Sequence, residues 1–184
     1  MKQWLMNLEW IKRVIPCRIE SNFPLNDWNK TWEYARLKGL DSETISFLWR
    51  MLHDVLPTRS RLYHMRMPRI ENENCQKFDV PDTIQHSLTT CQDSIFVFQW
   101  LQRGINRLSN RDLSAEDILF LNFPPTNTLA MVWFTATVFQ QIWKIKAKGK
   151  RPLLVEIRAE VEARINLLRK TKIGYVADTV KIMV

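Results

Sequence analysis

The chain has 184 residues, of which 46% are hydrophobic and 25% charged, as is ordinary for a folded globular protein. Only four glycines argue against a turn-rich β fold, and the formal net charge of +8 favours an acidic partner, nucleic acid before an anionic membrane surface. Three cysteines and early charged residues argue against a disulfide framework and a signal peptide. We therefore expect an intracellular protein, nuclear or cytoplasmic.

The first half of the chain predicts short helices and one loop. Residues 2–14 are expected to form a helix and residues 28–38 a second one. Residues 17–27 are expected to be the linker between them. Apolar residues at helical spacing predict a stronger helix over 42–56, which Pro57 ends. Thr58 is the predicted N-cap of the next helix. Residues 68–81 are polar and aperiodic, which indicates a loop.

The second half predicts longer helices. A short helix is expected over 82–90 and a longer one over 93–107, and Ser114 with Asp117 resembles a capping box. The apolar run from Leu129 to Phe139 lies in a predicted helix over 127–147 and reads as core, not as a membrane span. A last long helix carries an apolar stripe over 154–168. The apolar residues of 176–184 are expected to form a non-helical docking tail.

A metal-site spacing with one position changed lies in the loop region. Cys75, His86 and Cys91 fall where a zinc finger would place ligands, but Phe78 stands where the second cysteine is expected. Structural zinc takes four Cys or His ligands. Two interpretations stay open. Zinc binds three residues and is completed by water, Cys17 or His64, or the site is a relic in which Phe78 packs into the local core.

The residues around this spacing resemble one family. The stretch Phe47-Leu-Trp49-Arg50, followed by Leu56-Pro57-Thr58, is similar to the segment before the metal motif of the reverse transcriptase zinc-binding domain, the module after the polymerase in non-LTR, LINE-type retrotransposons. Further positions that match the family pattern are Leu62, Arg66, Cys75, His86, Cys91 and Trp100. The resemblance covers roughly residues 28–108. We accordingly expect three parts: an N-terminal helix and linker (1–27), the zinc-binding-like domain (28–108) and a helical extension packed on it (109–184). The resemblance also implies nucleic-acid binding.

The sequence has two basic clusters. One flanks the metal motif, and the other lies at and just after the end of the helix predicted over 127–147. Each cluster is predicted to contact the phosphates of a nucleic acid without recognising its base sequence. The alternative is that these side chains form an ordinary solvated surface. Trp49, like most of the tryptophans, lies at an apolar helical position and is predicted to be core, whereas Tyr63 is either core or a stacking residue. The predicted contact residues are Arg59, Arg61, Arg66, Arg69, Lys77, Lys144, Lys146, Lys148, Lys150 and Arg151.

The fold class expected from these patterns is all-α, an irregular multi-helix domain with a zinc-knuckle-like loop and two long C-terminal helices. No glycine-rich phosphate loop or Ser-His-Asp order stands out, so we expect no enzyme. The predicted function is sequence-tolerant binding of RNA or single-stranded DNA. The alternative is a helical protein–protein interaction module that uses the apolar tail.

Overall fold

The computed structural model describes residues 28–34, 39–171 and 173–184, so the helix expected over 2–14, the linker and Cys17 lie outside the described residues. Within the described part the fold is all-α, as predicted, and its β pairing is one bridge between Asn74 and Pro81. In chain order its helices are α3 (Trp28–Tyr34), α4 (Ser42–Leu52), α5 (Arg59–His64), the π-helical turn η1 (His86–Thr90), α6 (Ile95–Ser109), α7 (Ala115–Leu119), α8 (Thr128–Ala147), α9 (Leu154–Leu168) and α10 (Gly174–Met183).

Helix α8 is the centre of the molecule, and α4, α6, α9, α10 and η1 all pack against it. Every residue from 130 to 140 is buried, most of them apolar, and Phe134 and Phe139 are fully buried. A helix that is apolar on all sides is stable only when neighbours cover it. The prediction of a core helix is therefore confirmed. Within the described residues, no helix combines the length and apolarity that a membrane span requires.

Helix caps follow the sequence closely. Asp41 caps α4 and Thr58 caps α5 through their side chains, and Ser114 with Asp117 forms a reciprocal capping box at α7. Helix α4 ends earlier than predicted, at Leu52, because the chain turns through a left-handed residue at Asp54. Side-chain oxygens that satisfy the free N–H groups of a first turn make helix starts easier to predict than helix ends.

The C-terminal segment is helical, and the expectation of a non-helical docking tail is wrong. Helix α10 packs against α6, α8 and α9, and Val176 and Val180 are buried in the common core. Their spacing of four residues places them on one helical face. Ile182 points away from that face and is exposed. The apolar tail therefore docks on its own chain, and one hydrophobic core extends from Trp32 to Met183.

Trp49 lies outside the core, which corrects its prediction as a buried residue. Its side chain is 42% exposed and its ring lies 4.2 Å from that of His53, centroid to centroid. The inward face of α4 is formed by Leu48, Met51 and Leu52, all buried. Trp49 follows Leu48 by one residue, about 100° around the helix, which turns it to the edge of the core.

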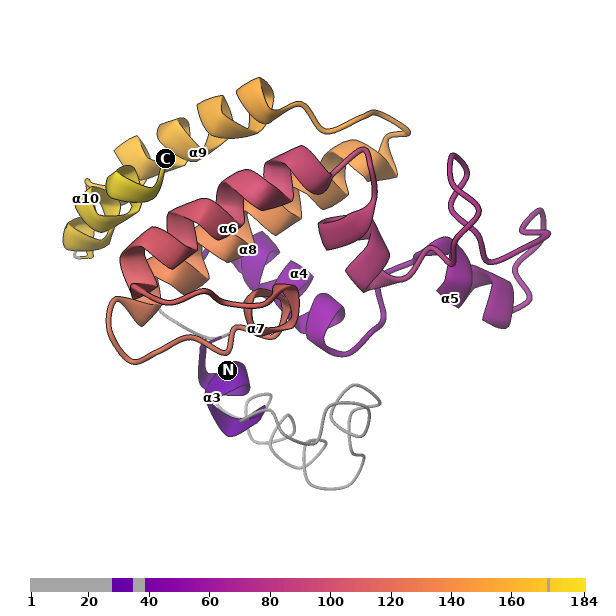
Figure 1. The fold of residues 1–184 in the computed structure, drawn as a ribbon, viewed down its shortest axis with the longest axis horizontal. Coiled ribbons are helices and arrows are strands. Elements are labelled where there is room, and N and C mark those ends of the chain that lie inside the picture. Colours follow the sequence, from indigo (N-terminus) through magenta and orange to yellow (C-terminus); the bar gives the residue numbers. More distant parts are fainter. Residues whose placement is uncertain (1–27, 35–38, 172) are drawn as a thin grey trace.

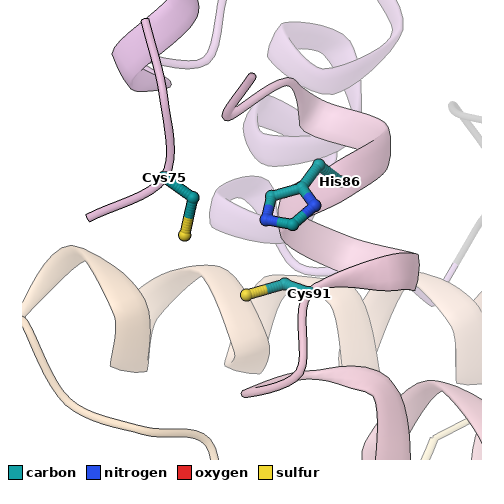
Figure 2. A group of neighbouring side chains, drawn as sticks. All are labelled: Cys75, His86 and Cys91. Atoms are coloured by element: carbon teal, nitrogen blue, oxygen red, sulfur yellow. The ribbon is translucent and has the colours of Figure 1, made fainter. Parts of the chain in front are cut away.

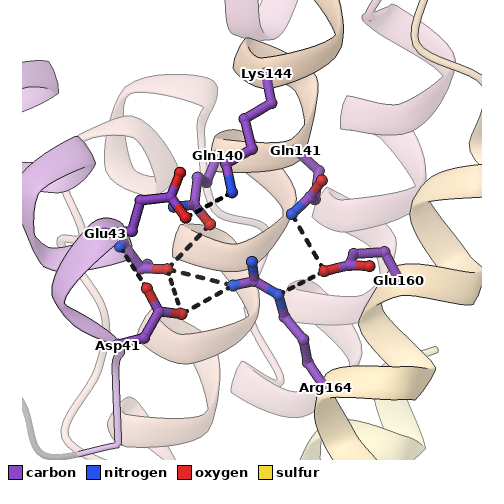
Figure 3. A network of polar contacts seen from close by, with 8 residues as sticks. Asp41, Glu43, Gln140, Gln141, Lys144, Glu160 and Arg164 are labelled. Carbon is purple, nitrogen blue, oxygen red and sulfur yellow. Dashed lines mark hydrogen bonds and ion pairs between the residues drawn. The ribbon is translucent and has the colours of Figure 1, made fainter.

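A polar network joins α4, α8 and α9 beside the core (Figure 3). Arg164 donates from Nε to Glu160 at 2.8 Å and from Nη1 to Asp41 at 3.2 Å. Thr44, on the first turn of α4, contacts both Asp41 and Gln140, each at 3.0 Å. Burial alone would raise the pKa of Asp41, but hydrogen bonds from Thr44 and the charge of Arg164 outweigh it and lower the pKa below 3.8.

We expect Asp41→Asn to make the free energy of unfolding depend less on pH in the acidic range. Because the pKa of Asp41 is lowered in the folded chain, its contribution is complete above 3.8 and is lost as the pH falls through the folded pKa. Asparagine keeps the N-cap but has no charge to lose. Urea unfolding at a series of acidic pH values measures this, with the exposed Glu162→Gln as control. Identical acid limbs for Asp41→Asn and the wild-type chain would contradict it.

Gly104→Ala tests the docking of α10. A Cβ at Gly104 would lie 2.8 Å from the carbonyl oxygen of Met183 and 3.1 Å from Phe134, so α10 would have to shift. We expect a loss of roughly 1–3 kcal/mol in the free energy of unfolding, as for an overpacked core. Chemical denaturation followed by circular dichroism measures it. If α10 were not seated there, alanine would instead stabilise α6 by about 1 kcal/mol through helix propensity.

Candidate metal centre and basic cleft

A small hairpin carries the first candidate ligand. The Cys75 N–H donates to the Val80 carbonyl at 2.8 Å, and the Asp82 N–H donates to the Glu73 carbonyl at 2.9 Å. At the tip the Phe78 N–H donates to the Cys75 carbonyl at 3.3 Å, which closes a tight turn. The predicted loop is thus a short hairpin, with Phe78 three residues beyond the first thiol. With α5, this hairpin projects from one end of the helical body, and α10 lies at the other (Figure 1).

Asp82 holds the hairpin against its neighbours. One carboxylate oxygen accepts from the Arg59 backbone N–H at 3.2 Å, and the other accepts from the Ser87 hydroxyl at 2.5 Å. The first bond reaches the start of α5, and the second reaches η1. A single side chain therefore joins the hairpin both to η1, five residues on, and to the start of α5, 23 residues earlier in the sequence.

The π-helical form of η1 brings the other two ligands together. The sequence predicts an ordinary helix over 82–90, in which His86 and Cys91 would lie about 140° apart around the axis. Instead the Cys91 N–H donates to the His86 carbonyl at 2.8 Å, the five-residue bond of a π-helix. This bond sets Cys91 one turn beneath His86. Single π-helical turns occur frequently at functional sites.

Cys75, His86 and Cys91 meet in one cluster, and one potential ligand atom from each lies within 4.8 Å of the others. Figure 2 shows His86 Nε2 facing the two sulfur atoms. This nitrogen is buried and has no hydrogen-bond partner, while Nδ1 lies 3.4 Å from the Thr90 hydroxyl. Burial lowers the pKa of His86, which favours the neutral imidazole that binds metals. The three residues could hold a metal ion, and two sulfurs with one nitrogen suit zinc.

No fourth protein ligand joins this cluster among the described residues. Phe78 is half-buried and lines a hollow of about 470 Å³ with Pro81 and His86, so it does not pack into the core as one interpretation expected. His64 is engaged elsewhere, because its Nε2 lies 3.2 Å from the Glu73 carboxylate. Cys17 lies outside the described residues. An ion bound here would keep one coordination position for a ligand from outside.

The thiols of Cys75 and Cys91 also form part of the wall of a cleft of about 420 Å³, which we call the basic cleft. Four of the predicted cations line it, two from each basic cluster, together with the indole of Trp143 and the carboxylates of Asp82 and Asp93. The four cations are Arg59, Lys77, Lys146 and Lys150.

The other predicted contact residues do not line this cleft. Arg61 donates to the Asp54 carbonyl at 2.7 Å and lines a separate hollow, and Lys144 pairs with Glu43 at 2.8 Å. Arg151 lies 3.7 Å from Asp93 at the margin of the cleft. The remaining three are exposed on loops: Arg66, Arg69 and Lys148.

Sequence reasoning missed the acidic and aromatic members of the cleft. Asp82 follows Pro81 at the start of a predicted helix, where an aspartate indicates an N-cap. The hydrogen bonds of its carboxylate could therefore have been anticipated from the sequence. Trp143 precedes Lys146 by three residues, which puts both on one face of α8. Asp93 carries no local signal, because its partners Lys77 and Arg151 are distant in sequence.

Searches against family models, curated proteins and solved structures find nothing that matches the chain. The resemblance to the reverse transcriptase zinc-binding domain therefore stays a prediction carried by the residues quoted for it. The structure adds that the three residues in its ligand positions lie together.

Phe78→Cys should convert the cluster into a tight zinc site. If the roughly 10–16 kcal/mol of a four-ligand site were shared equally, a fourth thiolate would add about 3 kcal/mol, or about a hundredfold in affinity. Competition with a zinc-binding dye measures the affinity, and the melting temperature should rise with bound zinc.

Val80→Cys is the matched control, because Val80 is exposed on the same hairpin but is not at the expected ligand position. Equal zinc affinity for Phe78→Cys and Val80→Cys would show that the hairpin does not direct residue 78 toward the cluster.

Proposed function

We propose that this chain is a non-catalytic nucleic-acid-binding module that binds RNA or single-stranded DNA with little sequence preference in the basic cleft. The observation that supports it is the convergence of two cation-bearing segments. Arg59 and Lys77 come from the region of the hairpin, and Lys146 and Lys150 from the end of α8 and the turn after it. Segments so far apart in sequence share one concave surface.

The cleft carries an excess of positive charge. Four cations face two carboxylates, Asp82 and Asp93, and Asp93 is shared between Lys77 at 2.6 Å and Arg151 at 3.7 Å. One carboxylate thus serves two cations. A cleft lined by one sign of charge concentrates ligands of the opposite sign.

Two of the cations are held in place by neutral groups. Arg59 donates from Nε to the Asn74 carbonyl at 2.8 Å, and Lys146 donates to the carbonyl and hydroxyl of Ser87 at 3.2 and 3.3 Å. These bonds orient the side chains without neutralising them. Fixed cations lose less side-chain entropy on binding than freely rotating ones.

Zinc, in this proposal, acts as a structural staple. An ion bound by Cys75, His86 and Cys91 would fasten the hairpin to η1 and so fix one wall of the basic cleft. Metal binding to a loop contributes directly to its folding free energy. The resemblance to a zinc-binding domain points in the same direction, and the residues present fit the ion.

Lys150→Glu should weaken binding to a short labelled single-stranded oligonucleotide, because it replaces a phosphate contact by a repulsion. Each phosphate neutralised on a single strand contributes about 0.7 to the slope of log K against log salt. We expect the wild-type slope to be near −3 for four contacts and to fall by about 0.7 in the variant. Fluorescence anisotropy across a salt series measures both.

Lys181→Glu makes the same charge change on α10, at the other end of the molecule from α5 and the hairpin (Figure 1). It should lower affinity less than Lys150→Glu. Equal losses from both variants would indicate attraction to net charge alone. Binding that does not depend on salt would favour the interaction-module alternative, since apolar docking releases no counterions.

A further inference from the structure

Trp143 occupies an unusual position for a tryptophan of this chain. Trp32, Trp100 and Trp133 are buried in the core, as predicted, whereas Trp143 is half-buried and lines the basic cleft. Its indole packs partly against the core and partly forms the cleft wall. The preceding residue, Ile142, is fully buried, so the core side of α8 ends here.

The cleft is lined by both apolar and charged side chains. Pro57 and Leu62 line it together with Trp143, and Lys146 follows Trp143 by one helical turn on the same face. Its volume of about 420 Å³ falls in the range of small-ligand sites. A ligand that satisfies both parts combines a flat apolar group with an anion.

We infer that Trp143 is the stacking platform for one unpaired base of a bound single strand, with the adjoining phosphates on Lys146 and Lys150. This inference rests on the proposed function and adds to it the part of the nucleotide that the cleft recognises. Aromatic side chains in cationic grooves bind unpaired bases of any sequence, because every base has a π face. Cations alone would account for phosphate contacts but not for the indole in the wall.

The same geometry selects single strands over duplexes. In a duplex the bases are stacked and paired inside the helix, and their faces are closed to a side chain in a protein cleft. Only a strand with unpaired bases can place one against Trp143 while its phosphates contact the lysines. We therefore expect a duplex of the same sequence to bind more weakly than either of its strands.

Trp49 is the competing candidate, since its side chain is 42% exposed. Its ring packs beside that of His53, which follows the end of α4, and it does not line the basic cleft. No cation of the cleft accompanies it, so a base stacked there would leave its phosphates without the contacts that Lys146 and Lys150 provide. Trp49 is accordingly the matched control.

The test compares Trp143→Leu, which keeps an apolar side chain but removes the aromatic face, with Trp49→Leu. Each protein is titrated with a labelled single-stranded oligonucleotide and, in competition, with inorganic polyphosphate, which has the charge but no bases. We expect Trp143→Leu to weaken oligonucleotide binding about 5- to 100-fold, the effect of losing one stacked base, and to leave polyphosphate binding unchanged. Trp49→Leu should change neither, and Trp143→Phe should restore most of the affinity.

The possible results distinguish failure of the base-stacking inference from failure of the proposed function. An equal loss for oligonucleotide and polyphosphate in Trp143→Leu would mean that the indole only shapes the cleft, and unchanged oligonucleotide binding would mean that no base stacks there. Either result overturns the inference and leaves the proposed function standing. Failure of the wild-type chain to bind the oligonucleotide at all would overturn both. Thermal melting of each variant confirms that it is folded.

Discussion

The carboxylate of Asp82 is the contact on which the rest of the candidate site depends. It accepts hydrogen bonds from the backbone of Arg59 and the hydroxyl of Ser87, while its own N–H closes the hairpin on Glu73. Together with the Lys77–Asp93 ion pair at 2.6 Å, these bonds hold the hairpin that carries the thiol of Cys75 near η1. A charged acceptor that satisfies several donors is among the stronger polar interactions in a protein, and the metal cluster and the basic cleft both rely on this one.

The core explains why this end of the molecule is available for binding. Helix α8 is buried through Ile142 and then emerges, so that its last turn carries Trp143 and Lys146 out toward the hairpin. The apolar first turns supply the stability of the fold, and the final turn supplies part of the cleft. A rigid helix that crosses from core to surface positions functional side chains more accurately than a loop does.

Local signals in the sequence were sufficient for most of the fold but for only part of the site. The Thr58 cap, the capping box of Ser114 and Asp117, and the apolar run of α8 are encoded within a few residues of where they act, and each was predicted. The π-helical turn and the burial of α10 depend on packing against distant segments, so periodicity alone missed them. The ligand positions Cys75, His86 and Cys91 could be predicted from their spacing, whereas the pairing of Asp93 with two distant cations could not.

Phe78 has a consequence at the level of the gene. Phenylalanine and cysteine codons differ by one base, so a single transversion separates this three-ligand cluster from a complete four-ligand site. The tight turn at the tip of the hairpin already exists with phenylalanine in place. The two forms are therefore neighbours in mutational terms, and a lineage that carries this chain can pass between an open and a closed coordination shell in one step.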